Sequence, residues 1–160
     1  MTKHTIWVVV ADEAIARILE RSDDGELEPV EEMTDAAAHA KGQDLRRDAV
    51  GRRAASASGG LATQGNATAS AGADERHLEA DGFARRVAAY LETAMHRSLF
   101  DELRLVAAPR FLGLLRKQLH PEVAKRVSDS LDKDLVHMVN SDITARLFPP
   151  RSAGGQAARP

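Results

Sequence analysis

Two groups of cationic side chains have the residue types that bind phosphates. Four arginines lie in a stretch rich in small residues, and three further cations lie where a predicted strand passes into a helix: Arg46, Arg47, Arg52 and Arg53, and then Arg110, Arg116 and Lys117. A flexible basic arm beside a rigid basic patch could follow a nucleic-acid backbone. Aromatic residues make up 4% of the chain and none lies among these arginines, so base stacking is not predicted. Each cation alone could equally be a solvated charge with an acidic neighbour.

The carboxylates offer a weaker pattern, that of a two-metal site for phosphoryl chemistry. Asp12 directly follows the first predicted strand, and Asp132 and Asp134 are the other acids that could approach it. Such a site needs several carboxylates at one place. The six histidines contain no pair at the spacing that puts two imidazoles on one helix face. We therefore predict no catalytic residue, no metal site and no cofactor.

A tripeptide near the C-terminus, Gly154-Gly155-Gln156, matches the peptidyl-tRNA hydrolysis signature of release factors. It lies in residues 151–160, a Gly-, Ala- and Pro-containing stretch that we expect to be a disordered tail. A three-residue match arises easily by chance in such a stretch, and we interpret it as a coincidence.

The segment that would position the second cationic group is Phe100–Leu119. Its apolar run Leu103–Ala108 ends at Pro109, and large apolar residues then recur at helical spacing. Proline lacks an amide hydrogen and has a fixed φ angle, so it ends a strand ladder and suits the first turn of a helix. We predict a buried strand that passes directly into a helix. Ligands of open α/β sheets tend to bind at such junctions.

The other predicted elements are strands at the N-terminus and alternating helices and strands later. The strands of an antiparallel meander are predicted at Ile6–Ala11, Ala14–Arg21 and Leu27–Met33, although Ala14–Arg21 could also be helical. The later elements are a helix at Glu75–Leu99 with Asp74 as its N-cap, a short helix at His120–Arg126, an edge strand at Ser128–Leu135 and a last helix at Val136–Leu147. Helices between strands require crossover connections, so we predict one α/β domain over residues 1–150, with a mixed sheet of about five strands and flanking helices.

Residues 35–74 interrupt this pattern. Ala, Gly, Ser and Thr dominate there, large apolar residues are almost absent, and no helical or strand period is found. A segment of this composition cannot bury enough surface to offset the entropy lost on ordering. We predict a long low-complexity insertion that is disordered in the free protein.

The composition limits the classes of function. A chain of 160 residues with 43% hydrophobic residues can bury one core. The net charge of −2 gives no global attraction to nucleic acids or membranes, so a basic contact must be local. There is no cysteine, which excludes disulfides and thiolate metal sites. The apolar run Thr5–Ala11 is too short for a signal peptide or a membrane helix, so we expect a cytoplasmic protein without a membrane partner.

Five segments resemble, in this order, the bacterial family of proteins required for attachment to host cells: TIWVVVADEAIARILE, AKGQDLRRDAVGR, DGFARRVAAYLE, FDELRLVAAPRFLGLLRKQL and DKDLVHM. They span most of the chain from Thr5 to Leu147, and LVAAPRFLGLLR is the most specific. The resemblance implies a ribonuclease-H-like fold related to the middle domain of archaeo-eukaryotic release factors. In those factors a GGQ loop lies just before the long helix. The corresponding residues here, 35–74, contain Gly59-Gly60 and Gln64 but no contiguous GGQ.

These observations leave three hypotheses for function. We favour a non-catalytic, cytoplasmic binding or regulatory domain that contacts RNA or the ribosome through the two cationic groups. The first alternative is a hydrolase that acts on phosphoester or peptidyl-tRNA bonds. The second alternative is an attachment factor that acts through protein–protein contacts.

Overall fold

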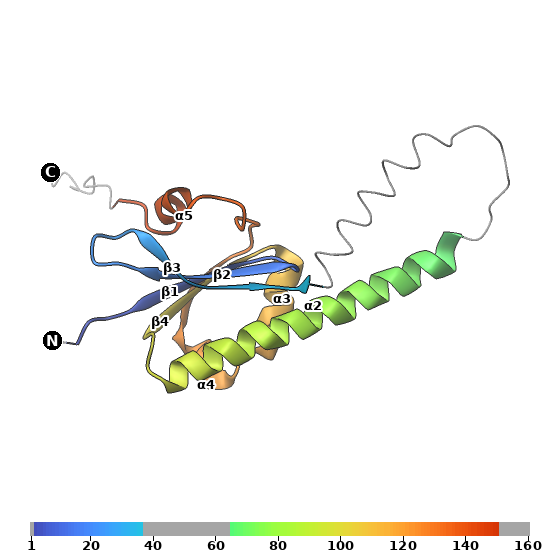
Figure 1. Ribbon diagram of the computed structural model, residues 1–160, viewed down its shortest axis with the longest axis horizontal. Coiled ribbons are helices and arrows are strands. Elements are labelled where there is room, and N and C mark those ends of the chain that lie inside the picture. The colour runs from blue at the N-terminus through green and yellow to red at the C-terminus, as the bar shows by residue number, and fades with distance from the viewer. Residues whose placement is uncertain (1, 37–64, 151–160) are drawn as a thin grey trace, which may run out of the picture.

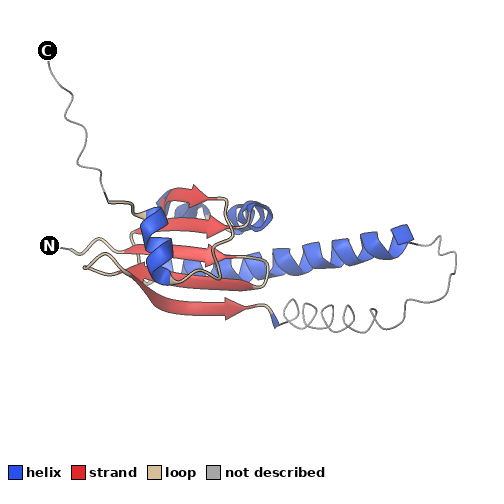
Figure 2. Cartoon of the chain, turned by 90° about the horizontal axis from the view of Figure 1, so that it is seen from above, coloured by secondary structure: helices blue, strands red, loops and turns tan. Residues whose placement is uncertain are grey.

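A mixed sheet with the strand order β3-β2-β1-β4-β5 forms the centre of the computed structural model, which describes residues 2–36 and 65–150 (Figures 1 and 2). The strands are β1 (Ile6–Ala11), β2 (Ile15–Arg21), β3 (Leu27–Thr34), β4 (Glu102–Ala107) and β5 (Val127–Leu131). β1 to β3 form an antiparallel meander, while β4 and β5 run parallel to β1. The predicted mixed α/β sheet of five strands is therefore confirmed.

The helices lie on both faces of this sheet, with more of them on one face than on the other. They are α2 (Gly65–His96), α3 (Pro109–Gln118), α4 (Pro121–Arg126) and α5 (Asn140–Leu147). α2, α3 and α4 cover one face, and the short α5 covers the other (Figure 1). The first half of α2 extends beyond the end of the sheet, so that only its second half packs on the strands (Figure 2).

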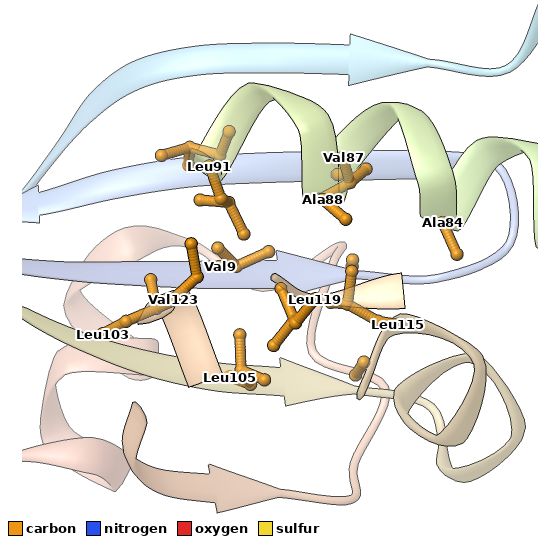
Figure 3. Close-up of a cluster of buried hydrophobic side chains, with 14 of the residues drawn as sticks. Val9, Ala84, Val87, Ala88, Leu91, Leu103, Leu105, Leu115, Leu119 and Val123 are labelled. Atoms are coloured by element: carbon orange, nitrogen blue, oxygen red, sulfur yellow. The ribbon is translucent and has the colours of Figure 1, made fainter. Parts of the chain in front are cut away.

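β1 contributes to two hydrophobic cores because successive side chains of a strand point to opposite faces. Trp7 and Val9 join the larger core under α2, α3 and α4, part of which is shown in Figure 3. Val8 and Val10 join the smaller core under α5. A strand buried on both faces needs a continuous apolar run rather than an alternating one, which explains the composition of β1.

The junction of β4 and α3 has the predicted form. Leu103 and Leu105 in β4 are fully buried, and α3 begins at Pro109, directly after the strand. Phe111 and Leu115 on α3 are also fully buried, and the Phe111 ring lies 5.7 Å from the Phe83 ring of α2. The predicted strand-to-helix passage is therefore confirmed.

Three predicted boundaries differ most from the structure. α2 begins at Gly65, so residues 65–74 are helical, and Asp74 is not an N-cap. Alanine is the best helix former, and adding residues to an existing helix is cheap, which explains why an Ala-rich stretch continues α2 without an apolar period. The earlier part of the predicted insertion, residues 37–64, lies outside the described residues, as does the predicted tail at 151–160.

The other two boundaries lie near the C-terminus. The edge strand ends at Leu131 rather than at Leu135, because the Asp134 carboxylate accepts a bond from the Val136 amide and forms a local turn. The last helix begins at Asn140 rather than at Val136. Arg17 of β2 donates to the carbonyl oxygens of Val136 and Met138, which holds the preceding segment as a loop.

Candidate functional site

α3 presents three predicted site residues on its solvent side, and we call Arg110, Arg116 and Lys117 the cationic face of α3. All three are exposed, while Phe111, Leu112, Leu114 and Leu115 are buried beneath them. Arg110 and Lys117 are seven residues apart, so they lie about two turns apart on the same side of the helix. The buried side of α3 packs on the sheet and α2, which fixes the position of these cations.

Within the described residues, few acidic groups neutralise this face. Arg110 Nε lies 3.9 Å from Glu13 Oε1, and their side chains are 63% and 44% exposed, so this ion pair is weak. Arg116 donates to the Ser130 hydroxyl of β5, which holds the side chain but does not offset its charge. Lys117 has no hydrogen-bond or ion-pair partner within the described part of the chain. The cationic face of α3 therefore keeps most of its positive charge.

The second predicted group, Arg46, Arg47, Arg52 and Arg53, lies outside the described residues. The association of these four arginines with the cationic face of α3 therefore stays a prediction.

Asp12, the acid considered for metal binding, has a structural role in the β1–β2 turn. One of its carboxylate oxygens, Oδ1, accepts bonds from the amides of Ala14 and Ile15, each 2.8 Å long. The Asp12 amide donates to the Ile15 carbonyl oxygen at 2.9 Å, which closes the same turn. Within residues 2–36 and 65–150, no group of three or more His, Cys, Asp or Glu side chains is arranged to hold a metal ion.

One contact between two histidines could not be predicted from their spacing on a single helix, because the two residues belong to different segments of the chain. The rings of His96, at the end of α2, and His120, before α4, have centroids 6.4 Å apart. His120 Nδ1 accepts a bond of 3.1 Å from the Glu122 amide and thereby caps α4. A His-Pro pair before a helical pattern was the available signal for this capping role.

A pocket lined by two cations, Lys3 and Arg21, lies at the opposite end of the sheet and was not predicted from the sequence. Lys3, His4 and Arg21 line this open pocket of about 270 Å³ beside the turn between β2 and β3. β1 and β2 bring these residues together, because the antiparallel register places the start of β1 opposite the end of β2. The sequence could have indicated this pocket only through that register, which cannot be assigned until the β1–β2 hairpin is known.

Glu102 connects this end of the sheet to neighbouring elements. Its carboxylate accepts bonds from the ring of His4, the hydroxyl of Ser128 and the guanidinium of Arg104, at 3.1, 2.6 and 3.2 Å. Desolvation raises the pKa of Glu102, but the hydrogen bonds from Ser128, His4 and Arg104 outweigh it, so the pKa lies below its ordinary value. Glu102 is therefore a charged acceptor that ties β4 to β5 and to the chain before β1.

The comparisons with known proteins point to one family. None of the helices in the described part is long and apolar enough to cross a membrane. No curated protein matches the chain. A family model, "Protein required for attachment to host cells", matches residues 7–147, which is most of the 160-residue chain. The chain therefore belongs to the family of proteins required for attachment to host cells.

Proposed function

We propose that this member of the attachment family is a non-catalytic, cytoplasmic domain that binds RNA, free or within the ribosome. The cationic face of α3 is the observation that supports this proposal best. It offers three exposed and weakly neutralised charges on a helix fixed by a buried apolar side. Cations of this kind contact phosphates without reading sequence, and they give affinity that depends steeply on salt. Arg46, Arg47, Arg52 and Arg53 would extend the same contact.

The role of Asp12 supports a function without catalysis. In a metal-dependent nuclease this carboxylate would face a metal ion, whereas here it accepts two backbone bonds within a turn. The mixed sheet with helices on both faces is compatible with the ribonuclease-H-like fold and the relation to release factors that the sequence resemblance implies. We retain both as proposals.

The test is RNA binding measured by fluorescence anisotropy over a series of salt concentrations, with a labelled single-stranded RNA. We compare the wild type with the double variant Arg110→Ala/Lys117→Ala. The matched control, Arg76→Ala/Arg97→Ala, removes two exposed arginines outside the proposed face, one on α2 and one directly after its last residue. Each lost phosphate contact should lower the slope of log affinity against log salt by about 0.7. The α3 variant should therefore lose roughly 1.4 units of slope, and the control should match the wild type.

The two alternative functions predict other results for the same wild-type protein. No association of the wild type with RNA or ribosomes at low ionic strength would refute the proposal. Binding to a host-cell protein under those conditions would favour an attachment factor that acts through protein contacts, which the family description supports. Turnover of a phosphoester or a peptidyl-tRNA would favour the hydrolase.

A further inference from the structure

The open pocket at the start of β1 lies far from the cationic face of α3. β1 and β4 are parallel, so Ile6 and Glu102 mark one end of the sheet, and Ala107, just before α3, marks the other. The turn between β2 and β3 and the N-terminal segment meet at the first end (Figure 1). The pocket is lined by one apolar residue and otherwise by polar, charged or glycine residues: Lys3, His4, Ile6, Arg21, Ser22, Asp23 and Gly25.

Arg21, the last residue of β2, is a cation of this pocket that has no ion-pair partner among residues 2–36 and 65–150. Its Nε is the buried side-chain nitrogen without a hydrogen-bond partner within the described residues. A buried polar group of this kind normally has a partner, and an arginine presents five N–H donors in a fixed fork. Arg21 therefore has donors that the rest of the described structure does not use.

The surroundings of Arg21 fix the orientation of its guanidinium. Its Cζ lies 4.1 Å from the centroid of the Phe148 ring, and Arg104 Cζ lies 4.3 Å from the same centroid. A guanidinium that packs on an aromatic ring keeps the N–H donors at its edge free. On another side, Arg21 Nη2 lies beside Gly25, since a Cβ added at this glycine would stand 3.7 Å from it. The contact with the Phe148 ring thus orients the plane of the guanidinium before any ligand binds.

The other charges of the pocket leave Arg21 unneutralised. Lys3 Nζ lies 3.3 Å from Asp23 and 3.8 Å from Glu20, so these carboxylates face Lys3 rather than Arg21, although such exposed ion pairs are weak. The Ser22 hydroxyl and the Asp24 carboxylate bond to each other within the turn. Arg104 is paired with Glu102 and also donates to the Leu147 carbonyl oxygen. Among the residues that the structure describes, Arg21 is therefore the charge of the pocket that no carboxylate pairs with.

We infer that this pocket binds the oxyanion of a small molecule, a phosphate or a carboxylate, with Arg21 as its anchor. A guanidinium edge matches two oxygens of either group. A volume of about 270 Å³ suits a small ligand. Asp23, which lines the pocket, and Asp24 and Glu26 beside it repel any anion and repel a long polyanion most, so the pocket is distinct from the RNA contact proposed for α3 and does not depend on it.

The experiment is a titration of the full chain, followed by the amide resonances of Ser22 and Gly25 in NMR spectra. Inorganic phosphate and acetate are the two probes, each at constant ionic strength with chloride as the balancing ion. Saturation by phosphate but not by acetate identifies a phosphate-bearing ligand, and the reverse identifies a carboxylate. We expect one of them to saturate both resonances with a single affinity.

Variants assign that binding to Arg21. Arg21→Gln removes the charge and should weaken binding about tenfold or more, as expected for the loss of a charged hydrogen bond. Arg21→Lys keeps the charge but loses the fork, and should bind with intermediate affinity. Arg76→Gln, the control on the projecting part of α2, should bind like the wild type. RNA binding by Arg21→Gln should be unchanged, which separates this site from the one on α3.

Two results would overturn the inference. The first is a linear, unsaturated response of the wild-type resonances to both probes, because it shows only general ionic effects. The second is wild-type affinity in Arg21→Gln, because the anchor would then lie elsewhere. Thermal unfolding of each variant shows whether it is folded. If Arg21→Gln is unfolded, the test rests on Arg21→Lys, and wild-type affinity in that variant would overturn the inference.

Discussion

Replacing Phe111 by Ala should strongly destabilise the protein, because this ring lies where α3, α2 and the sheet meet. Phe111 is fully buried, and its ring lies 5.7 Å from that of Phe83, in the range of an aromatic pair. Removing a buried phenyl group loses its transfer free energy and leaves a cavity. Such changes cost about 3–5 kcal/mol.

Urea denaturation measures this loss. With an m-value of about 2 kcal/mol/M, a loss of 4 kcal/mol lowers the midpoint by roughly 2 M urea. Phe111→Leu should cost less than Phe111→Ala, because it retains most of the buried volume. Leu78→Ala on α2 is the matched control, since Leu78 is 71% exposed, and it should change stability by less than ~0.5 kcal/mol. A loss below ~0.5 kcal/mol in Phe111→Ala would mean that α3 does not pack as described.

Three further predictions concern single residues. Ser98, two residues after the end of α2, has a positive φ of 56°, so Ser98→Gly should raise the free energy of unfolding by roughly 0.5–1 kcal/mol, measured by urea denaturation. The lowered pKa of Glu102 stabilises the fold above the unfolded-state pKa of ~4.3, and this contribution is lost as pH falls through the lower folded-state value. Glu102→Gln should therefore flatten the dependence of the unfolding midpoint on pH in that acid range, and an unchanged profile would contradict this. Asp12→Ala should cost ~1–3 kcal/mol and Asp12→Asn clearly less, because only Asn keeps an oxygen acceptor for the turn amides; equal losses would show that the carboxylate has another role.

The junction of β4 and α3 could be predicted because its signals are local. The apolar run Leu103–Ala108, the proline that ends it and the helical spacing of Phe111 and Leu115 all lie within twenty residues of sequence. Each signal acts through sterics or periodicity of the segment itself. The cationic face of α3 follows from the same periodicity, since the residues between the buried positions must face solvent.

The C-terminal segment could not be predicted in this way, because a distant residue determines it. The sequence predicted a strand up to Leu135 and a helix from Val136, and both of these residues are buried. Arg17 bonds to the Val136 carbonyl oxygen across 119 residues of sequence, and the helix begins only at Asn140. The pocket at Arg21 escaped prediction for a similar reason, since the β1–β2 register and the position of Phe148 create it.

The strand order also determines which pairings can form early in folding. β1 and β2 are joined by a short turn and pair between neighbours such as Ala11 and Ala16. The start of β4 contacts the start of β1 across 96 residues, between Asp101 and Thr5. Local hairpins form within microseconds, whereas distant pairings are slower because a long loop must close.

During synthesis the N-terminal meander therefore leaves the ribosome before its partner strand exists. Until β4 docks, β1 presents an unpaired, apolar strand edge, and such edges promote association between chains. In the folded protein β4 covers that edge along the whole length of β1. A nascent or truncated chain that ends before residue 102 is accordingly expected to aggregate. In a chain that includes β4, this strand covers the exposed edge of β1.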